Sequence, residues 1–76
     1  MIKEHDVVVL TKDVPEQKLR ARDVGAVVHV YEGARACEVY FITGSGSTLA
    51  VATLEPADVR PVGAGEILHV RIVAAA

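Results

Sequence analysis

Cysteine, aromatic residues and long apolar runs are scarce in this sequence. Cys37 is its only cysteine, so no disulfide can form within the chain, and a single unpaired cysteine is typical of a reducing compartment. No apolar run approaches the ~18 residues of a membrane-spanning helix. The charged N-terminus lacks the apolar middle region of a signal peptide. We therefore expect a cytoplasmic protein with no membrane contact.

An excess of one charge is also missing. Eight basic and ten acidic residues give a net charge of −2, which argues against a protein that binds polyanions through its overall charge. The three histidines His5, His29 and His69 lie far apart in the chain, and none has the spacing of a zinc motif. A metal site would require them to converge in space with Cys37. We expect no metal and no cofactor.

Aliphatic residues, above all valine, are abundant. Hydrophobic residues make up 51% of the chain although aromatics supply only 4%, and β-branched side chains favour pleated sheets. Short runs of this kind, separated by turn-forming residues, predict five strands. Their expected bounds are 6–11, 25–31, 36–43, 48–54 and 59–62.

The third of these segments shows the clearest alternation. Cys37, Val39 and Phe41 share one face, and Glu38 and Tyr40 share the other, so we expect the first face to be buried. By the same alternation, His29 is expected on the face opposite Val28 and Val30.

The turns between the strands carry specific chemistry. Gly33 can supply the positive φ of a turn, residues 44–47 form a Gly/Ser turn, and 55–58 is typical of a tight turn, such as a 3₁₀ turn, ended by an aspartate. Pro61 indicates that the fifth strand lies at a sheet edge. No segment has the sustained 3.6-residue periodicity of an ordinary helix.

These elements predict one all-β domain over residues 1–73. The expected architecture is a small SH3-like barrel of five short antiparallel strands, because closure of the sheet removes exposed edges. The apolar segment 66–73 is expected to be an additional C-terminal strand, paired within its own chain or with a neighbouring one. Residues 74–76 are expected to fray.

Three stretches resemble a known family. Residues 6–11, 23–31 and 58–62 are similar to a family of short stand-alone bacterial proteins, the domain of unknown function family 4926. The resemblance covers about 6–70 and implies the fold, but no reaction and no catalytic residues. Residues 23–30 are also distantly similar to KOW-type barrels of ribosomal and transcription proteins.

Apolar strand surface exceeds what one small barrel can bury. Residues 49–52 and 67–73 are apolar on both faces, so one face must meet a folded-back tail or another subunit. We expect a homo-oligomer, with a dimer as the default form. The candidate interface residues are His29, Tyr31, Tyr40, Leu49, Val51, Ile67, Leu68, Val70 and Ile72.

A nucleic-acid surface is the main alternative. Lys12, Lys18, Arg20 and Arg22 gather in the long first loop, and Arg35 is expected to join them; Lys18, Arg20, Arg22 and Arg35 are the candidate contacts. Acidic residues in the same loop leave it at net +1, and aromatics for base stacking are few, so a solvated charged loop is favoured.

No catalytic constellation is recognisable. Cys37 fits a small buried residue better than a nucleophile, and residues 44–47 precede a strand rather than the helix of a phosphate loop. The sequence therefore predicts a non-enzymatic protein-interaction module that self-associates. The alternatives are a KOW-like nucleic-acid binder and an accessory or antitoxin-like subunit of another protein.

Overall fold

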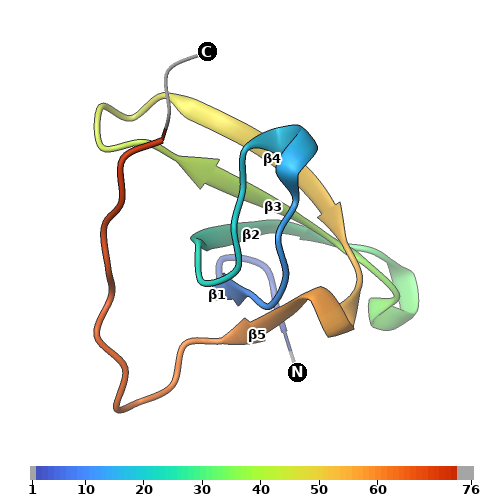
Figure 1. Cartoon of the computed structure of the whole chain (residues 1–76). Coiled ribbons are helices and arrows are strands. Elements are labelled where there is room, and N and C mark those ends of the chain that lie inside the picture. Colours follow the sequence, from blue (N-terminus) through green and yellow to red (C-terminus); the bar gives the residue numbers. More distant parts are fainter. Residues whose placement is uncertain (1, 74–76) are drawn as a thin grey trace.

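Five strands make up most of the protein, shown in Figure 1 as a computed structural model that describes residues 2–73. Three single-turn 3₁₀ helices, labelled η, complete the regular structure of this part of the chain: η1 (Pro15–Gln17), η2 (Glu32–Ala34) and η3 (Pro56–Asp58). Residues 2–73 contain no helix with the length and hydropathy of a transmembrane span. The strands are β1 (Val7–Leu10), β2 (Val24–Val30), β3 (Cys37–Ile42), β4 (Thr48–Leu54) and β5 (Val59–Pro61).

The strands form one antiparallel sheet in the order β4-β3-β2-β1-β5. β1 to β4 follow one another as a meander, and the chain then returns to place β5 beside β1, so the sheet curls around its core (Figure 1). β4 and β5 are its edges. The predicted all-β class with five antiparallel strands is confirmed, and so is the edge position of the strand that contains Pro61.

The core is the concave face of this sheet. The alternation predicted for β3 is confirmed, since Cys37, Val39 and Phe41 are buried whereas Tyr40 is exposed. One further core residue comes from the long first loop. Leu19 is only 2% exposed, because its backbone pairs with Val14 and folds the loop back over the core.

A bulge in β2 changes the alternation. The register with β3 shifts between Val27 and His29, so Val28 and His29 are both exposed whereas Val27 is buried and Val30 packs against the core. The prediction that His29 lies opposite Val28 was therefore wrong. A bulge adds one residue to one strand, and the alternation of residue types in the sequence does not reveal it.

The predicted turns are present. Gly33 has a φ of 74°, and η3 is capped by Asp58, whose carboxylate accepts a hydrogen bond from the Glu55 amide at 3.0 Å. In β2, residue 25 must be glycine because there is no room for a side chain: a Cβ there would lie 2.6 Å from Val39 Cγ1 and 2.7 Å from the Tyr40 carbonyl oxygen.

Residues 62–73 differ from the prediction. They run as an extended arm beside the sheet, from the end of β5 towards the turn between β3 and β4 (Figure 1), and they pair with no strand among the described residues. The expected C-terminal strand over 66–73 is thus not formed in the single chain. The predicted fraying of 74–76 lies outside the described residues.

Candidate functional site

The convex side of the sheet carries a row of apolar residues that crosses four strands. The register places Val7 of β1 beside Ala26, Ala26 beside Tyr40, and Tyr40 beside Val51 of β4. Val7, Tyr40 and Val51 are 49%, 37% and 42% exposed. Directly opposed residues in adjacent strands have their Cβ atoms ~5 Å apart, so the row is continuous. We call this row, with the exposed neighbours Val28 and Ile42, the outer face.

A hydrogen-bonded group borders the outer face. The Tyr31 hydroxyl and the Thr53 hydroxyl both donate to Oε2 of Glu38, at 2.6 and 2.8 Å. The hydrogen bond from Tyr31, followed by that from Thr53, lowers the pKa of Glu38, and the same bond to Glu38 raises the pKa of Tyr31. His29 packs edge-on against Tyr31, with ring centroids 4.7 Å apart. This border is polar and ordered, which suits the rim of an interface.

The arm, residues 62–73, is attached to the body near its start by a set of hydrogen bonds, which we call the first clip. Arg60 donates to both carboxylate oxygens of Glu66, at 2.7 Å each, and the Gly63 amide donates to Glu66 Oε1 at 2.6 Å. These bonds lower the pKa of Glu66 to about 2, with Arg60 as the main cause. They fix the direction in which the arm leaves β5.

A second clip holds the far end of the arm. Arg71 donates to Asp23 Oδ1 from Nε at 2.8 Å and to Oδ2 from Nη2 at 2.6 Å, and Nη2 also donates to the Lys18 carbonyl at 2.9 Å. Burial by itself would raise the pKa of Asp23, but the bonds from Arg71 and from the Arg20 amide outweigh it, so the pKa is lowered. No sequence pattern predicts this pair, whose members are 48 residues apart.

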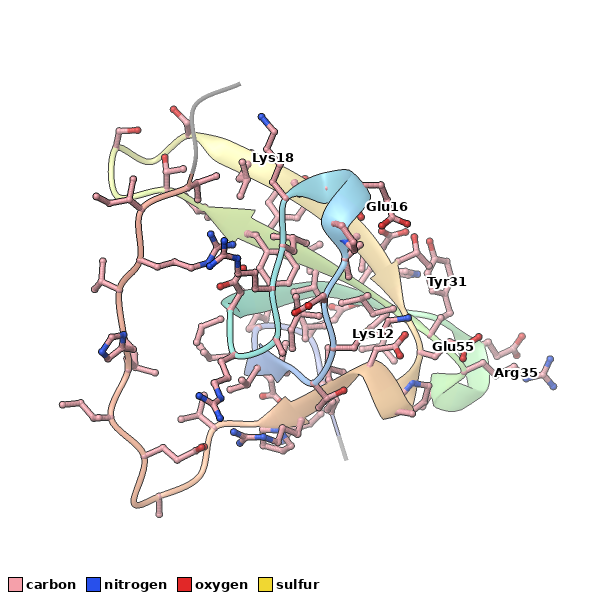
Figure 2. The ribbon with its side chains drawn as sticks, in the orientation of Figure 1. Lys12, Glu16, Lys18, Tyr31, Arg35 and Glu55 are labelled. Carbon is pink, nitrogen blue, oxygen red and sulfur yellow. The ribbon has the colours of Figure 1, made fainter. Side chains whose placement is uncertain are left out.

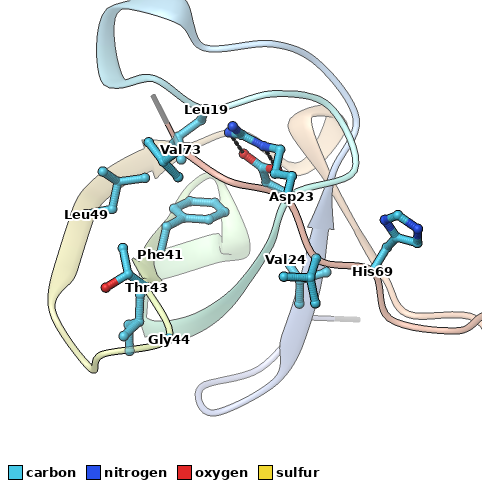
Figure 3. A pocket seen from close by; sticks show the side chains of 12 residues that line it. Leu19, Asp23, Val24, Phe41, Thr43, Gly44, Leu49, His69 and Val73 are labelled. Atoms are coloured by element: carbon cyan, nitrogen blue, oxygen red, sulfur yellow. Dashed lines mark hydrogen bonds and ion pairs between the residues drawn. The ribbon is translucent and has the colours of Figure 1, made fainter. Parts of the chain in front are cut away.

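A hollow of about 440 Å³ lies between the arm and the body. Figure 3 shows the ring of Phe41 at its centre, with Leu49 and Thr43 to one side and Asp23 to the other. His69, Val70, Arg71 and Val73 line it from the arm. The arm therefore bridges the opening at this end of the sheet without filling it.

The interface residues predicted from sequence lie mainly on two surfaces: the outer face with its border, and the arm. On the sheet and at its border, His29, Tyr31, Tyr40 and Val51 are exposed, whereas Leu49 is half-buried and packs against the core. On the arm, the aliphatic side chains are the most exposed of the large hydrophobic residues in the described part of the chain: Ile67 88%, Leu68 60%, Val70 88% and Ile72 94%.

The basic residues do not form one cluster. Lys18 lies beside η1 and Arg35 beside η2, at separate places on the body (Figure 2). The expected grouping of Arg35 with the first loop was therefore wrong. Lys18, Arg20 and Arg22 remain exposed in that loop, and nucleic-acid contact by these three stays a prediction.

The residues considered for metal binding or catalysis lie in different settings. His29 Nδ1 is 3.6 Å from Glu4, His69 lines the hollow, and Cys37 is buried in the core. Among residues 2–73 no three potential ligands from His, Cys, Asp and Glu gather. Burial, followed by the charges of Glu38 and Asp58, raises the pKa of the Cys37 thiol, and so disfavours the thiolate that a nucleophile needs.

The comparison with known proteins covers the sheet but not the arm. The sequence matches the domain of unknown function DUF4926 over residues 4–61. The chain belongs to the DUF4926 family. The match ends with the last residue of β5, so the arm lies beyond the DUF4926 region, whereas its anchor Asp23 lies within it. No curated protein and no solved structure matches the chain, and the SH3-like and KOW-like resemblances stay predictions.

Proposed function

We propose that this DUF4926 protein is a non-catalytic interaction module that associates with copies of itself and docks on another protein. The observation that carries the proposal is the distribution of exposed apolar side chains. Every large hydrophobic residue that is exposed among the described residues belongs to the outer face, to its Tyr31 border or to the arm. Apolar groups gathered in this way mark interaction surfaces, whereas scattered ones do not.

The size of these surfaces supports association. Full burial of one aliphatic side chain is worth about 1.5–3 kcal/mol, and association of two proteins costs about 4–15 kcal/mol in lost freedom. Four aliphatic side chains of the arm and at least four residues of the outer face are available. Burial of either set covers much of that cost, so binding through one surface leaves the other for a second partner.

The environment of the reactive groups supports a non-catalytic role. The Cys37 thiol is held in the core with a raised pKa. His29 faces Glu4 and Tyr31 on the surface, outside the hollow. Covalent catalysis requires a nucleophile and a general base within hydrogen-bond reach of each other. The buried Cys37 and the exposed His29 lie in different settings.

Light scattering over a range of protein concentrations tests the proposal. The wild-type chain is expected to exceed the monomer mass at the highest concentrations and to approach it on dilution. Val51→Lys on the outer face, Val70→Lys on the arm and both together identify the surface responsible. Ala57→Lys is the matched control, because Ala57 is exposed on η3 and belongs to neither surface. A wild-type chain that is monomeric at every concentration would overturn the proposal.

A further inference from the structure

The arm has the backbone of a strand without a neighbour. From residue 67 to residue 73, no backbone amide or carbonyl is hydrogen-bonded to another backbone group of the described chain. Its side chains alternate at the far end, where Val70 and Ile72 are 88% and 94% exposed while Arg71 and Val73 are partly buried against the body. An extended segment with unpaired backbone groups and an apolar outward side is a template for strand pairing.

The sequence of the arm is symmetric in character about Val70. Leu68 and Ile72 stand two residues to either side of it, and all three are aliphatic and exposed. An antiparallel pair related by a two-fold axis brings residues at equal distances from the axis opposite one another. With the axis at Val70, every opposed pair on this outward side is therefore aliphatic.

We propose that the arm of one copy pairs with the arm of a second copy as an antiparallel two-stranded ribbon centred on Val70. In this register Val70 opposes the partner's Val70, and Leu68 opposes the partner's Ile72. The inference rests on the self-association proposed above and adds to it the segment, the orientation and the register.

The two clips prepare the arm for this role. Glu66 is bound to Arg60 and Gly63 at one end, and Arg71 to Asp23 at the other, so 67–70 is a span held at both ends. Holding the ends lowers the conformational entropy that pairing must remove. Arg71 is the arm residue that the second clip binds. Leu68, Val70 and Ile72 remain 60%, 88% and 94% exposed, although Val70 also borders the hollow, so their exposed surface is available to a partner.

The expected area favours a weak, reversible dimer. Taking roughly 60–120 Å² for each fully buried aliphatic side chain, the four exposed aliphatic residues of each of two arms bury at most about 500–1,000 Å², because side chains of a two-stranded ribbon keep one side in solvent. Stable interfaces bury about 1,200–2,000 Å², and smaller ones are typical of transient complexes. The ribbon therefore forms at high protein concentration and dissociates on dilution.

Disulfide trapping in the full-length protein tests the register. Opposed Cα atoms of an antiparallel pair lie ~4.5–5.5 Å apart, within the ~4.4–6.8 Å that a disulfide spans. Val70→Cys therefore places two thiols opposite each other at the axis. Ile72→Cys is the matched control: it is at least as exposed, but the two substituted positions are offset by four residues, about 13 Å along the strands. Wild type controls for the buried Cys37.

The expected result is a disulfide-linked dimer that forms at least tenfold faster for Val70→Cys than for Ile72→Cys under mild oxidation. The double variant Leu68→Cys/Ile72→Cys is expected to link as rapidly as Val70→Cys, because each new thiol then opposes one on the other arm. Equal rates for Val70→Cys and Ile72→Cys in a chain that light scattering shows to dimerise would overturn the ribbon and leave self-association standing. A chain that remains monomeric overturns both, and leaves the strand of another protein as the occupant.

Discussion

Arg71 and Asp23 are joined by two parallel hydrogen bonds, at 2.8 and 2.6 Å, across 48 residues of sequence. Arg71 lies in the arm, beyond the DUF4926 region, and Asp23 lies just before β2 within that region. The side chains of the pair are 27% and 16% exposed, so solvent screens the interaction only in part. The pair therefore fixes an apolar arm to a sheet that is complete without it.

Removal of this clip should loosen the arm more than the sheet. Arg71→Ala is expected to lower the free energy of unfolding by about 1 kcal/mol, as for a partly exposed charged pair. Arg71→Lys should recover only part of the loss, because an ammonium lacks the planar fork that binds both carboxylate oxygens. Urea denaturation followed by circular dichroism measures both.

Arg35→Ala is the control for that experiment, since Arg35 is an exposed arginine next to η2 and outside the clip. A loss as large for Arg35→Ala as for Arg71→Ala would contradict the assignment.

Acid should release the start of the arm. The pKa of Glu66 in the folded chain is about 2, below its ordinary value of 4.5, so the stabilisation is complete above pH 4.5 and is lost as the pH falls towards 2. The Gly63 amide reports this change in NMR spectra, because it donates to Glu66. Its chemical shift should titrate with a midpoint near 2, and Glu66→Gln should remove that titration. A midpoint near 4.5 would show that the clip does not form.

Gly25 should not tolerate a side chain. In Gly25→Ala the new Cβ would lie 2.6 Å from Val39 Cγ1, 2.7 Å from the Tyr40 carbonyl oxygen and 2.9 Å from Phe41 Cε1, so strands must move apart. Overpacking of this kind costs about 1–3 kcal/mol. Thermal unfolding should show the loss. Gly44→Ala, with nothing within 4 Å of the new atom, should change stability little. Equal effects would mean that β2 and β3 do not approach so closely.

Cys37 should react with thiol reagents only when the core opens. The side chain is 5% exposed, and burial raises the pKa of its thiol. Its modification by an aromatic disulfide reagent in native buffer should be slower than that of a free thiol by several orders of magnitude, and denaturant should abolish the difference. Rapid reaction in native buffer would place Cys37 at the surface.

Local pattern was sufficient to predict the five strands. The alternation of Cys37, Val39 and Phe41 set the buried face of β3, and Pro61 placed β5 at an edge. The bulge after Val27 was not predictable, because it adds a residue without changing the residue types. Leu19 was missed as a core residue because its polar neighbours predict a solvated loop, whereas its backbone pairs with Val14 and turns it inward.

The arm shows a different limit. Residues 66–73 are apolar enough to form a strand, but apolar character does not provide a neighbouring strand, and within the described chain none is adjacent. The interface residues proposed there, such as Val70 and Ile72, were identified from composition alone. The hollow and the Asp23–Arg71 clip depend on contacts between distant residues, which no sequence window contains.

The exposed aliphatic arm is the surface through which copies of the chain are proposed to meet. Amide NMR spectra of the full-length protein, recorded at increasing concentration, test this residue by residue. The resonances of 67–72 are expected to shift and to gain protection from hydrogen exchange as concentration rises, while those of buried β3 residues such as Val39 stay unchanged. Spectra that do not change with concentration, or changes confined to residues away from the arm and the outer face, would contradict it.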